Sequence, residues 1–237
     1  MSILDKLLNL VRSRRKSSGR KLYDSGFHGD KYLLKLVDSI AYDCEYFVET
    51  GANVGSTLKY TSEKYGHMKC FSCEPDNMAY KKSLHNTNHL KNVHIFNEGA
   101  KSFLSRLGEE YSFALSGKSL LWIDAHGCGF EWPLQYEVDF VSRNFQHGYM
   151  LIDDFRVPHI DRFSYDAYEG QECSFDYIQG CISEDWSYQL YYPDYMEQTS
   201  SYHPLRGWGL FTFGDMRDKI PDEVSSFVRA KSEISEQ

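Results

Sequence analysis

Short apolar runs alternate with amphipathic stretches through the centre of the chain, and this alternation is what most constrains the fold. The runs have the length of strands, and the stretches between them carry apolar residues at helical spacing. Repeated strand–helix units fold into a mostly parallel sheet with helices on both faces. The expected strands are 46–50, 68–74, 93–97, 119–124 and 149–153, and the expected helices between them are 55–65, 76–88, 101–115 and 132–145.

The segments on either side of this alternation complete the expected fold. A helix is expected over 31–43, and a polar, aromatic loop at 156–172 leads to a helical segment near 174–185. Two strand-like runs follow at 187–192 and 207–213, joined by a Pro- and Tyr-rich connection. We therefore predict an α/β, Rossmann-like fold. It is a doubly wound, seven-stranded, mostly parallel sheet with an antiparallel edge hairpin.

The length of 237 residues predicts one domain with an extension at each end. Residues 31–214 form the predicted domain, residues 1–30 an amphipathic and basic N-terminal extension, and residues 215–237 a polar C-terminal tail. The N-terminal extension fits either a partly frayed segment or a peripheral membrane contact through residues 3–21. Its apolar helical face consists of Ile3, Leu4, Leu7, Leu8 and Val11.

Charge is distributed unevenly along the chain, whose net charge is −8. The first 35 residues carry nine Lys and Arg against three Asp and Glu, whereas the remainder carries 17 against 31. Such an acidic body argues against a nucleic-acid partner. No apolar run approaches the roughly 20 residues of a membrane span, and no signal-peptide pattern is present. We expect a cytoplasmic location. The alternative is a cytoplasmic protein that is attached peripherally to a membrane.

The first expected strand ends in an acid and runs into a turn with two glycines, in YFVETGANVGST at 46–57. Gly51 permits a sharp turn after Glu49, and Gly55 permits close approach of the helix that follows. This order indicates the place where an open α/β sheet binds a nucleotide-like ligand; a purely structural turn is the alternative. Asn53 stands at the second glycine of the dinucleotide fingerprint, which disfavours a pyrophosphate ligand and a dehydrogenase.

An acid also ends the second expected strand. Glu74 lies 23 residues after Gly51, where a carboxylate can accept hydrogen bonds from both hydroxyls of a ribose. The alternative is a helix cap, because Pro75 and Asp76 follow at the start of a helical run. We favour the ribose contact because of the neighbouring glycine turn.

Three further acids end the fourth and fifth expected strands. Asp124, Asp153 and Asp154 would repel one another unless a cation neutralises them, and Mg²⁺ is the commonest ion for carboxylate oxygens. In the alternative, Asp154 caps the next segment and pairs with Arg156. His126 stands two residues after Asp124, where it is placed as a general base or further ligand, or has a structural role.

Five short segments in order resemble class I S-adenosylmethionine-dependent methyltransferases, over about residues 30–214. They are VETGANVGST, CEPD, NEGAKSFL, WIDAHG and LIDDF. The resemblance implies methyl transfer with S-adenosyl-L-methionine as the cofactor. It assigns cofactor contacts to Glu49, Gly51, Asn53, Gly55, Ser56, Glu74, Gly99, Ala100 and Asp124.

Within that family, the D-x-H and D-D segments resemble the metal-dependent O-methyltransferases of the catechol and macrocin types. This resemblance implies Mg²⁺ on Asp124, Asp153 and Asp154. In the sugar-directed branch the base is an Asp at the position of His126, and in the catechol branch a Lys stands at the position of Gly127. His126 departs from the Asp of the sugar-directed branch but can also take a proton, whereas Gly127 cannot replace the Lys of the catechol branch. The sugar-directed branch therefore fits better.

These observations predict an O-methyltransferase that acts on a hydroxyl of a sugar or other vicinal diol, assisted by a divalent metal. Asp124 and His126 are the expected catalytic residues, and a small molecule or saccharide is the expected acceptor. Tyr165, Tyr168, His159 and His203 are candidates to contact a sugar ring or, equally, ordinary packing and surface residues. The alternatives are a metal-independent methyltransferase with another acceptor and an inactive scaffold with the same fold.

Overall fold

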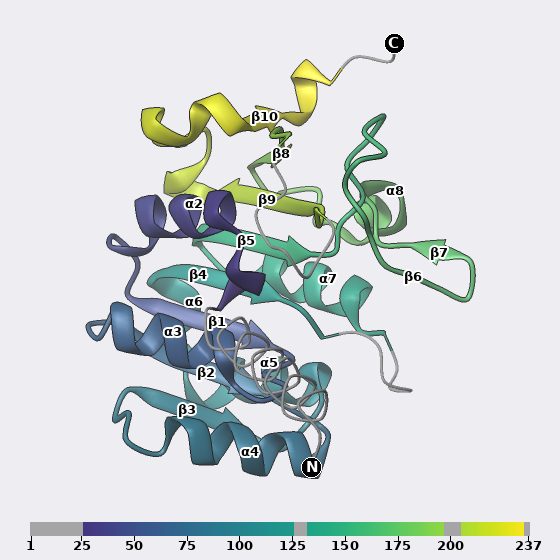
Figure 1. Ribbon diagram of the computed structural model, residues 1–237. Helices are drawn as coiled ribbons and strands as arrows, with labels where there is room; N and C mark the ends of the chain where they lie inside the picture. Colours follow the sequence, from purple (N-terminus) through teal and green to yellow (C-terminus); the bar gives the residue numbers. More distant parts are fainter. Residues whose placement is uncertain (1–25, 126–131, 197–204, 235–237) are drawn as a thin grey trace, which may run out of the picture.

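The computed structural model of the chain describes residues 26–125, 132–196 and 205–234. Its strands are β1 (Tyr46–Thr50), β2 (Lys69–Cys73), β3 (Val93–Phe96), β4 (Lys118–Ile123), β5 (His147–Asp153), β8 (Tyr188–Pro193), β9 (Trp208–Phe213) and β10 (Val228–Ala230). All eight belong to one sheet in the order β10-β8-β9-β5-β4-β1-β2-β3 (Figure 1). The predicted Rossmann-like α/β architecture is confirmed.

The five strands from β1 to β5 are parallel, and their order reverses beside β1. The chain moves outward from β1 through β2 to β3, then returns to β4 on the other side of β1. β1, β2, β4 and β5 are buried almost throughout, which explains why the sequence shows continuous apolar runs rather than alternation. The reversal creates a topological switch point between β1 and β4, the place where such sheets bind ligands.

Helices cover both faces of the sheet (Figure 1). They are α2 (Lys31–Ala41), α3 (Ser56–Lys64), α4 (Asn77–Thr87), α5 (Ala100–Glu110), α6 (Phe113–Ser116), α7 (Leu134–Asn144) and α8 (Phe175–Ile178). α3 contacts α4, whereas α5 contacts α7 and α7 contacts α8. Right-handed crossovers that run in opposite directions from β1 place these two groups on opposite faces.

Several expected elements differ in detail. The helix expected over 101–115 is divided at Tyr111 into α5 and α6, and that near 174–185 is shortened to α8 and a 3₁₀ turn, Gln179–Cys181. The loop at 156–172 contains a small hairpin of β6 (Ala167–Tyr168) and β7 (Gln171–Glu172). Its two turn residues both have left-handed backbone conformations, as a tight hairpin requires.

The predicted hairpin of β8 and β9 is antiparallel, but it is not at the edge of the sheet. β9 pairs with β5, and β10 covers the other side of β8. The sheet therefore has eight strands rather than the predicted seven. β10 comes from the segment expected to be a polar tail, where Val224 and Phe227 of the 3₁₀ helix Asp222–Phe227 are buried. These apolar residues explain why the segment folds onto the domain.

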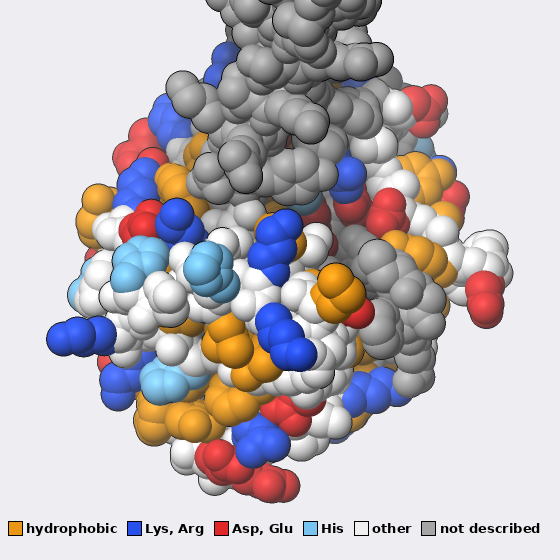
Figure 2. Space-filling model, turned by 60° about the horizontal axis from the view of Figure 1, so that its bottom comes forward, with side chains coloured by type: hydrophobic (Ala, Val, Ile, Leu, Met, Phe, Trp, Pro, Cys, Tyr) orange, Lys and Arg blue, Asp and Glu red, His pale blue; other side chains and the backbone are white. Residues whose placement is uncertain are grey.

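The surface at the β3 and α4 end of the molecule is mixed in character. On the face that Figure 2 shows, hydrophobic side chains lie among Lys, Arg and His rather than in one patch. Among the described residues, no helix combines the length and apolar character that crossing a membrane requires. The amphipathic helix and basic run predicted before residue 26 lie outside the described residues, so contact with a membrane stays a prediction.

Candidate active site

Gly51 brings the ends of β1 and β4 together at the switch point. Its φ of +85° lies in the left-handed region, and a Cβ at this position would lie 2.5 Å from the backbone oxygen of Asp124. The amides of Gly51 and Ala52 both donate to the carbonyl of Cys73, at 3.1 and 2.8 Å, which ties the turn to the end of β2. Only glycine combines this conformation with so close an approach.

The turn continues into α3 through Asn53 and Gly55, which also have positive φ values. Gly55 is the N-cap of α3, and Ser56 is the first residue of that helix. A Cβ on Gly55 would lie 3.0 Å from the Cβ of Ser83 in α4, so the start of α3 packs closely against its neighbour. The predicted sequence of strand, glycine turn and helix is confirmed.

Glu74 reaches from the end of β2 into this turn. Its side chain is buried, and its two oxygens accept hydrogen bonds from the amides of Asn53 (2.7 Å) and Asp76 (2.9 Å). The cap of α4 is Asp76, which accepts from the amide of Ala79 at 2.8 Å. The helix-cap alternative therefore applies to Asp76. A carboxylate can accept about four hydrogen bonds, which leaves Glu74 capacity for two ligand hydroxyls.

Glu49 lies inside the sheet, one residue before the end of β1. The hydroxyl of Ser72 on β2 donates to its carboxyl group at 2.7 Å. Burial raises the pKa of Glu49 to about 8, with smaller contributions from the negative charges of Asp124 and Glu74, while the Ser72 hydrogen bond opposes the shift. Glu49 is therefore mostly protonated at neutral pH, so its carboxyl group can also donate a hydrogen bond.

The end of β3 lies against the end of β2. The side-chain amide of Asn97 donates to the backbone oxygen of Glu74 at 2.8 Å. Gly99 then forms the N-cap of α5, and a Cβ on it would meet no atom within 4 Å. Ala100 is buried at the first position of the helix. The predicted cofactor residues Gly99 and Ala100 thus lie at the same edge of the sheet as the glycine turn.

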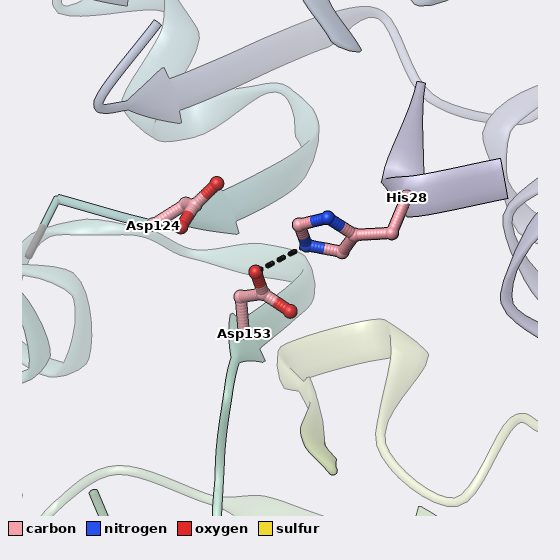
Figure 3. A group of neighbouring side chains, drawn as sticks. All are labelled: His28, Asp124 and Asp153. Atoms are coloured by element: carbon pink, nitrogen blue, oxygen red, sulfur yellow. Dashed lines mark hydrogen bonds and ion pairs between the residues drawn. The ribbon is translucent and has the colours of Figure 1, made fainter. Parts of the chain in front are cut away.

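On the other side of the switch point, His28 lies beside Asp124 and Asp153 (Figure 3). The imidazole Nε2 is 2.5 Å from Oδ2 of Asp153, and one candidate ligand atom from each residue lies within 4.8 Å of the other two. Trp122 orients Asp124 through a hydrogen bond of 3.3 Å from its indole nitrogen. The Asp153 carboxylate raises the pKa of His28 to about 9, against the opposing effect of burial.

Asp154 is not a member of this group. Its carboxylate forms an ion pair with Arg206, from the residues that lead into β9, and its φ is +48°. The three predicted carboxylates therefore do not converge: two of them meet His28, and the third meets a guanidinium. The alternative partner Arg156 pairs with Glu172 instead. His126, the predicted base, lies outside the described residues, so its role stays a prediction.

With this geometry established, the chain can be compared with known proteins. No protein-family model matches the sequence, and no curated protein matches it. The O-methyltransferase from Bacillus cereus, solved in complex with SAH, is 15% identical over 86% of this chain and 90% of its own, with a TM-score of 0.54. A Klebsiella pneumoniae protein assigned as an O-methyltransferase is 14% identical, with coverage of 81% and 82% and a TM-score of 0.54.

The chain has the class I methyltransferase fold. Relative to this fold, the glycine turn, Glu74 and the β3 end form the side predicted to bind the cofactor. Asp124, Asp153 and His28 lie toward β5, on the side predicted to receive the acceptor.

The side of the sheet predicted to receive the acceptor is bordered by aromatic residues. The rings of Trp132 and Tyr177 are stacked at 4.5 Å, and Tyr168 lies 5.2 Å from Trp132. The hairpin that carries Tyr168 is fastened beside the strand-end acids, because the amide of Asp166 donates to the carbonyl of Asp154 at 3.0 Å. The negative charge of Asp154 contributes to the raised pKa of Tyr168, after burial and the hydrogen bond to Asp166.

Of the other candidates for sugar contact, Tyr165 and His159 do not join the aromatic border in the part of the chain that the structure describes. The hydroxyl of Tyr165 donates to Glu172 at 2.8 Å on the surface of the hairpin, and His159 is exposed. His203 lies outside the described residues. Among the candidates that the structure describes, Tyr168 is the one with ring contacts in the aromatic border.

His28 is the site residue that the sequence analysis missed, because residues 1–30 were assigned to an extension. It lies in a turn, Gly26–Gly29, whose four residues all have positive φ values. Phe27 in this turn is fully buried and packs edge-on against Trp122 at 5.0 Å. The available signal was local: two glycines enclose the His, and Asp30 follows as the N-cap of α2.

Proposed function

We propose that the protein is an S-adenosylmethionine-dependent O-methyltransferase that acts on a hydroxyl of a sugar or other vicinal diol. The observation that carries the cofactor assignment is Glu74, buried beside the glycine turn and aligned by the amide of Asn53. A buried carboxylate at the end of β2, next to the switch point, is suited to the two hydroxyls of a ribose. The fold shared with the two O-methyltransferases supports the same proposal.

The protein's task in this reaction is to position and deprotonate the acceptor. When bound, the cofactor supplies an electrophilic methyl group on sulfur. The residues at the acceptor side must hold a hydroxyl oxygen in line with that methyl group and accept its proton. Asp124 and Asp153 provide carboxylates at this edge that can accept a proton, and His28 provides an imidazolium that pairs with Asp153, because that carboxylate raises its pKa to about 9. We assign the acceptor hydroxyl to the space that these three residues border.

The aromatic border supports a sugar as the acceptor. Sugar rings present apolar faces that pack on aromatic side chains, and the stacked pair of Trp132 and Tyr177 is partly exposed beside Tyr168. The hydroxyls on the edge of the ring would then face Asp124 and Asp153. This arrangement favours a saccharide or related polyol over a flat apolar acceptor.

A magnesium ion on three carboxylates does not fit this arrangement, because the guanidinium of Arg206 occupies the Asp154 carboxylate. A cation at this edge would instead meet Asp124, Asp153 and a nitrogen ligand, His28. We therefore assign no step of the reaction to Mg²⁺ bound by Asp154.

Calorimetric titration with S-adenosylhomocysteine tests the cofactor assignment. We expect one-to-one binding by the wild type and at least a tenfold loss of affinity in Glu74→Ala, because the ribose hydroxyls lose their acceptor. The matched control is Glu110→Ala, which removes an exposed acid at the C-terminal end of α5 that pairs with Arg106 at 2.9 Å. This control should bind like the wild type. A folded wild type that does not bind, or equal affinities in Glu74→Ala and wild type, would contradict the proposal and leave a scaffold with this fold.

A further inference from the structure

We propose that His28, Asp124 and Asp153 bind a divalent transition-metal cation that accepts an imidazole nitrogen, in preference to Mg²⁺. The inference deepens the proposed function, since the cation would lie beside the acceptor hydroxyl. It rests on the three side chains drawn in Figure 3, which come from a turn before α2 and from the ends of β4 and β5. The cation assigned from the sequence used Asp154, so this is a different ligand set.

The distances suit one small cation. Metal–ligand bonds of about 2.1 Å place the ligand atoms of an octahedral ion about 3 to 4 Å apart. In the structure, one nitrogen or oxygen atom from each of the three residues lies within 4.8 Å of the other two. The Nε2 of His28 and Oδ2 of Asp153 are 2.5 Å apart across a hydrogen bond, so a cation would take the place of the proton between them and the two atoms would separate by about 1 Å. β4 and β5 are paired up to Ile123 and Ile152, so Asp124 and Asp153 stand at neighbouring strand ends.

The chemistry of the donors decides the class of cation. Mg²⁺ prefers oxygen ligands and keeps much of its water, whereas imidazole nitrogen suits Fe²⁺, Co²⁺, Ni²⁺ and Zn²⁺. One imidazole and two carboxylates together form a mixed nitrogen and oxygen ligand set, which Fe²⁺, Co²⁺, Ni²⁺ and Zn²⁺ accept. The nitrogen of His28 is therefore the ligand that should favour a transition-metal cation over Mg²⁺. Removal of the His28 imidazole should reduce this preference.

The electrostatic environment also favours a cation. The Asp153 side chain is 1% exposed, and a carboxylate so deeply buried requires compensation by positive charge or hydrogen bonds. Asp124 adds a second carboxylate, with an oxygen within 4.8 Å of the candidate ligand atoms of Asp153 and His28. His28 meets the need for compensation at Asp153 through its ion pair, and a bound cation would replace the proton of the imidazole as the positive charge between Asp153 and Asp124.

The surroundings of the ligands hold them in place. The indole nitrogen of Trp122 donates to Asp124, and the ring centres of Trp122 and His28 are 6.2 Å apart. Phe27, one residue before His28, is fixed by its burial and by a hydrogen bond of 3.3 Å from its amide to the hydroxyl of Thr57. Groups that orient the ligands in this way contribute to metal affinity.

Cobalt provides the test, because its visible absorption distinguishes nitrogen and oxygen ligands from thiolates. Purified full-length protein would be titrated with Co²⁺ and with Mg²⁺ by calorimetry, and with Co²⁺ by absorption. We expect one Co²⁺ per chain, a spectrum without thiolate bands, and binding of Mg²⁺ at least tenfold weaker. His28→Ala should weaken Co²⁺ binding at least tenfold and Mg²⁺ binding much less.

Three further variants complete the experiment. His28→Asn keeps a side chain that tolerates the left-handed backbone, so it reports the loss of the imidazole if His28→Ala fails to fold. His89→Ala removes an exposed imidazole that faces Glu63 at 3.1 Å and should leave Co²⁺ binding unchanged. Asp154→Asn separates the two ligand sets: it should retain Co²⁺ binding, whereas a site built on three carboxylates would lose it.

The outcomes are separable from those of the cofactor test. Equal Co²⁺ affinities in wild type and both His28 variants, or equal affinities of the wild type for Co²⁺ and Mg²⁺, would overturn the metal assignment. Glu74→Ala should lose S-adenosylhomocysteine but keep Co²⁺, and His28→Asn should show the reverse. The metal proposal can therefore fail while the cofactor proposal stands, and the cofactor proposal can fail while the metal proposal stands.

Discussion

At the scale of single residues, Glu49 shows how position in the sheet changes the chemistry of an acid. Its carboxyl group is buried between β2 and β4, where it meets the Ser72 hydroxyl rather than water. Its position was predicted from the sequence because it ends an apolar run, but its protonation was not. That property depends on burial, which only the packed sheet creates.

The raised pKa of Glu49 predicts a pH-dependent stability. The pKa of the folded state, about 8, exceeds the ordinary value of 4.5, so the folded chain binds the proton more tightly than the unfolded chain. The contribution to stability is complete below about pH 4.5 and is lost as the pH rises through about 8. Glu49→Gln keeps an acceptor for Ser72 and cannot ionise. We expect its free energy of unfolding to fall less steeply with pH than that of the wild type.

Urea denaturation at pH 5, 7 and 9 measures this difference, which is limited to about 1.4 kcal/mol per pH unit. Glu110→Gln is the control, because Glu110 is exposed and pairs with Arg106 on the surface. Parallel pH profiles for Glu49→Gln and the wild type would refute the assignment of the proton to Glu49.

At the scale of elements, the turn of residues 26–30 connects a strained backbone to the site. Gly26 and Gly29 adopt positive φ without steric cost, but the left-handed conformations of Phe27 and His28 cost energy and persist only where the surroundings determine them. Asp30 is central to this support. Its carboxylate accepts from the amides of Tyr32 and Leu33 at the start of α2 and from the hydroxyl of Tyr195 at 2.6 Å.

Asp30→Ala should therefore destabilise the protein by about 2 to 3 kcal/mol, since it removes a helix cap and leaves the buried Tyr195 hydroxyl with one acceptor fewer. Urea denaturation at neutral pH measures the change. Ser174→Ala is a useful comparison, because the hydroxyl of Ser174 caps the short helix α8 by accepting a single hydrogen bond of 3.4 Å from the amide of Tyr177. Its expected cost is below about 1 kcal/mol. Equal costs for the two variants would contradict the dual role of Asp30.

The elements also show which parts of the site could be predicted from sequence. The glycine turn, Glu74 and Asp124 were foreseen because each lies next to an apolar run, and parallel strands end at one edge of the sheet. His28 and the partner of Asp154 were not foreseen. The first depends on packing of Phe27 against Trp122, and the second on Arg206, 52 residues away. Both contacts join residues that are far apart in the sequence, so hydrophobic periodicity does not predict them.

At the scale of the whole molecule, the two end segments of the described domain meet at Tyr195. The ring of Tyr195 stacks on Tyr32 at 4.4 Å and packs edge-on against Phe227 at 6.4 Å, while its hydroxyl bonds Asp30. β10 follows directly after Phe227 and adds the eighth strand. The sequence analysis missed this closure because Val228–Ala230 is short and contains the exposed Arg229.

Phe227→Ala should destabilise the fold by about 3 kcal/mol, since it removes a buried ring from the contact with Tyr32 and Tyr195. Chemical denaturation followed by circular dichroism would measure it. Met78→Ala, at a side chain that is 82% exposed, should change the stability by less than about 0.5 kcal/mol. A Phe227 variant as stable as the Met78 variant would show that the C-terminal segment does not support the domain.

The meeting of both end segments at Tyr195 has a consequence for biosynthesis. The turn with His28 is made before the sheet, whereas Tyr195 follows the five parallel strands and Phe227 lies in the last described segment. A nascent chain can pair β1, β2 and β4 before then, but it has no Tyr195 to secure Asp30. Chains that stop before Tyr195 would thus contain the glycine turn, Glu74 and the contact of Phe27 with Trp122, while lacking the bond that secures Asp30 beside the His28 turn. Full support of the turn that carries His28 is in this way reserved for chains in which Tyr195 and Phe227 have been made.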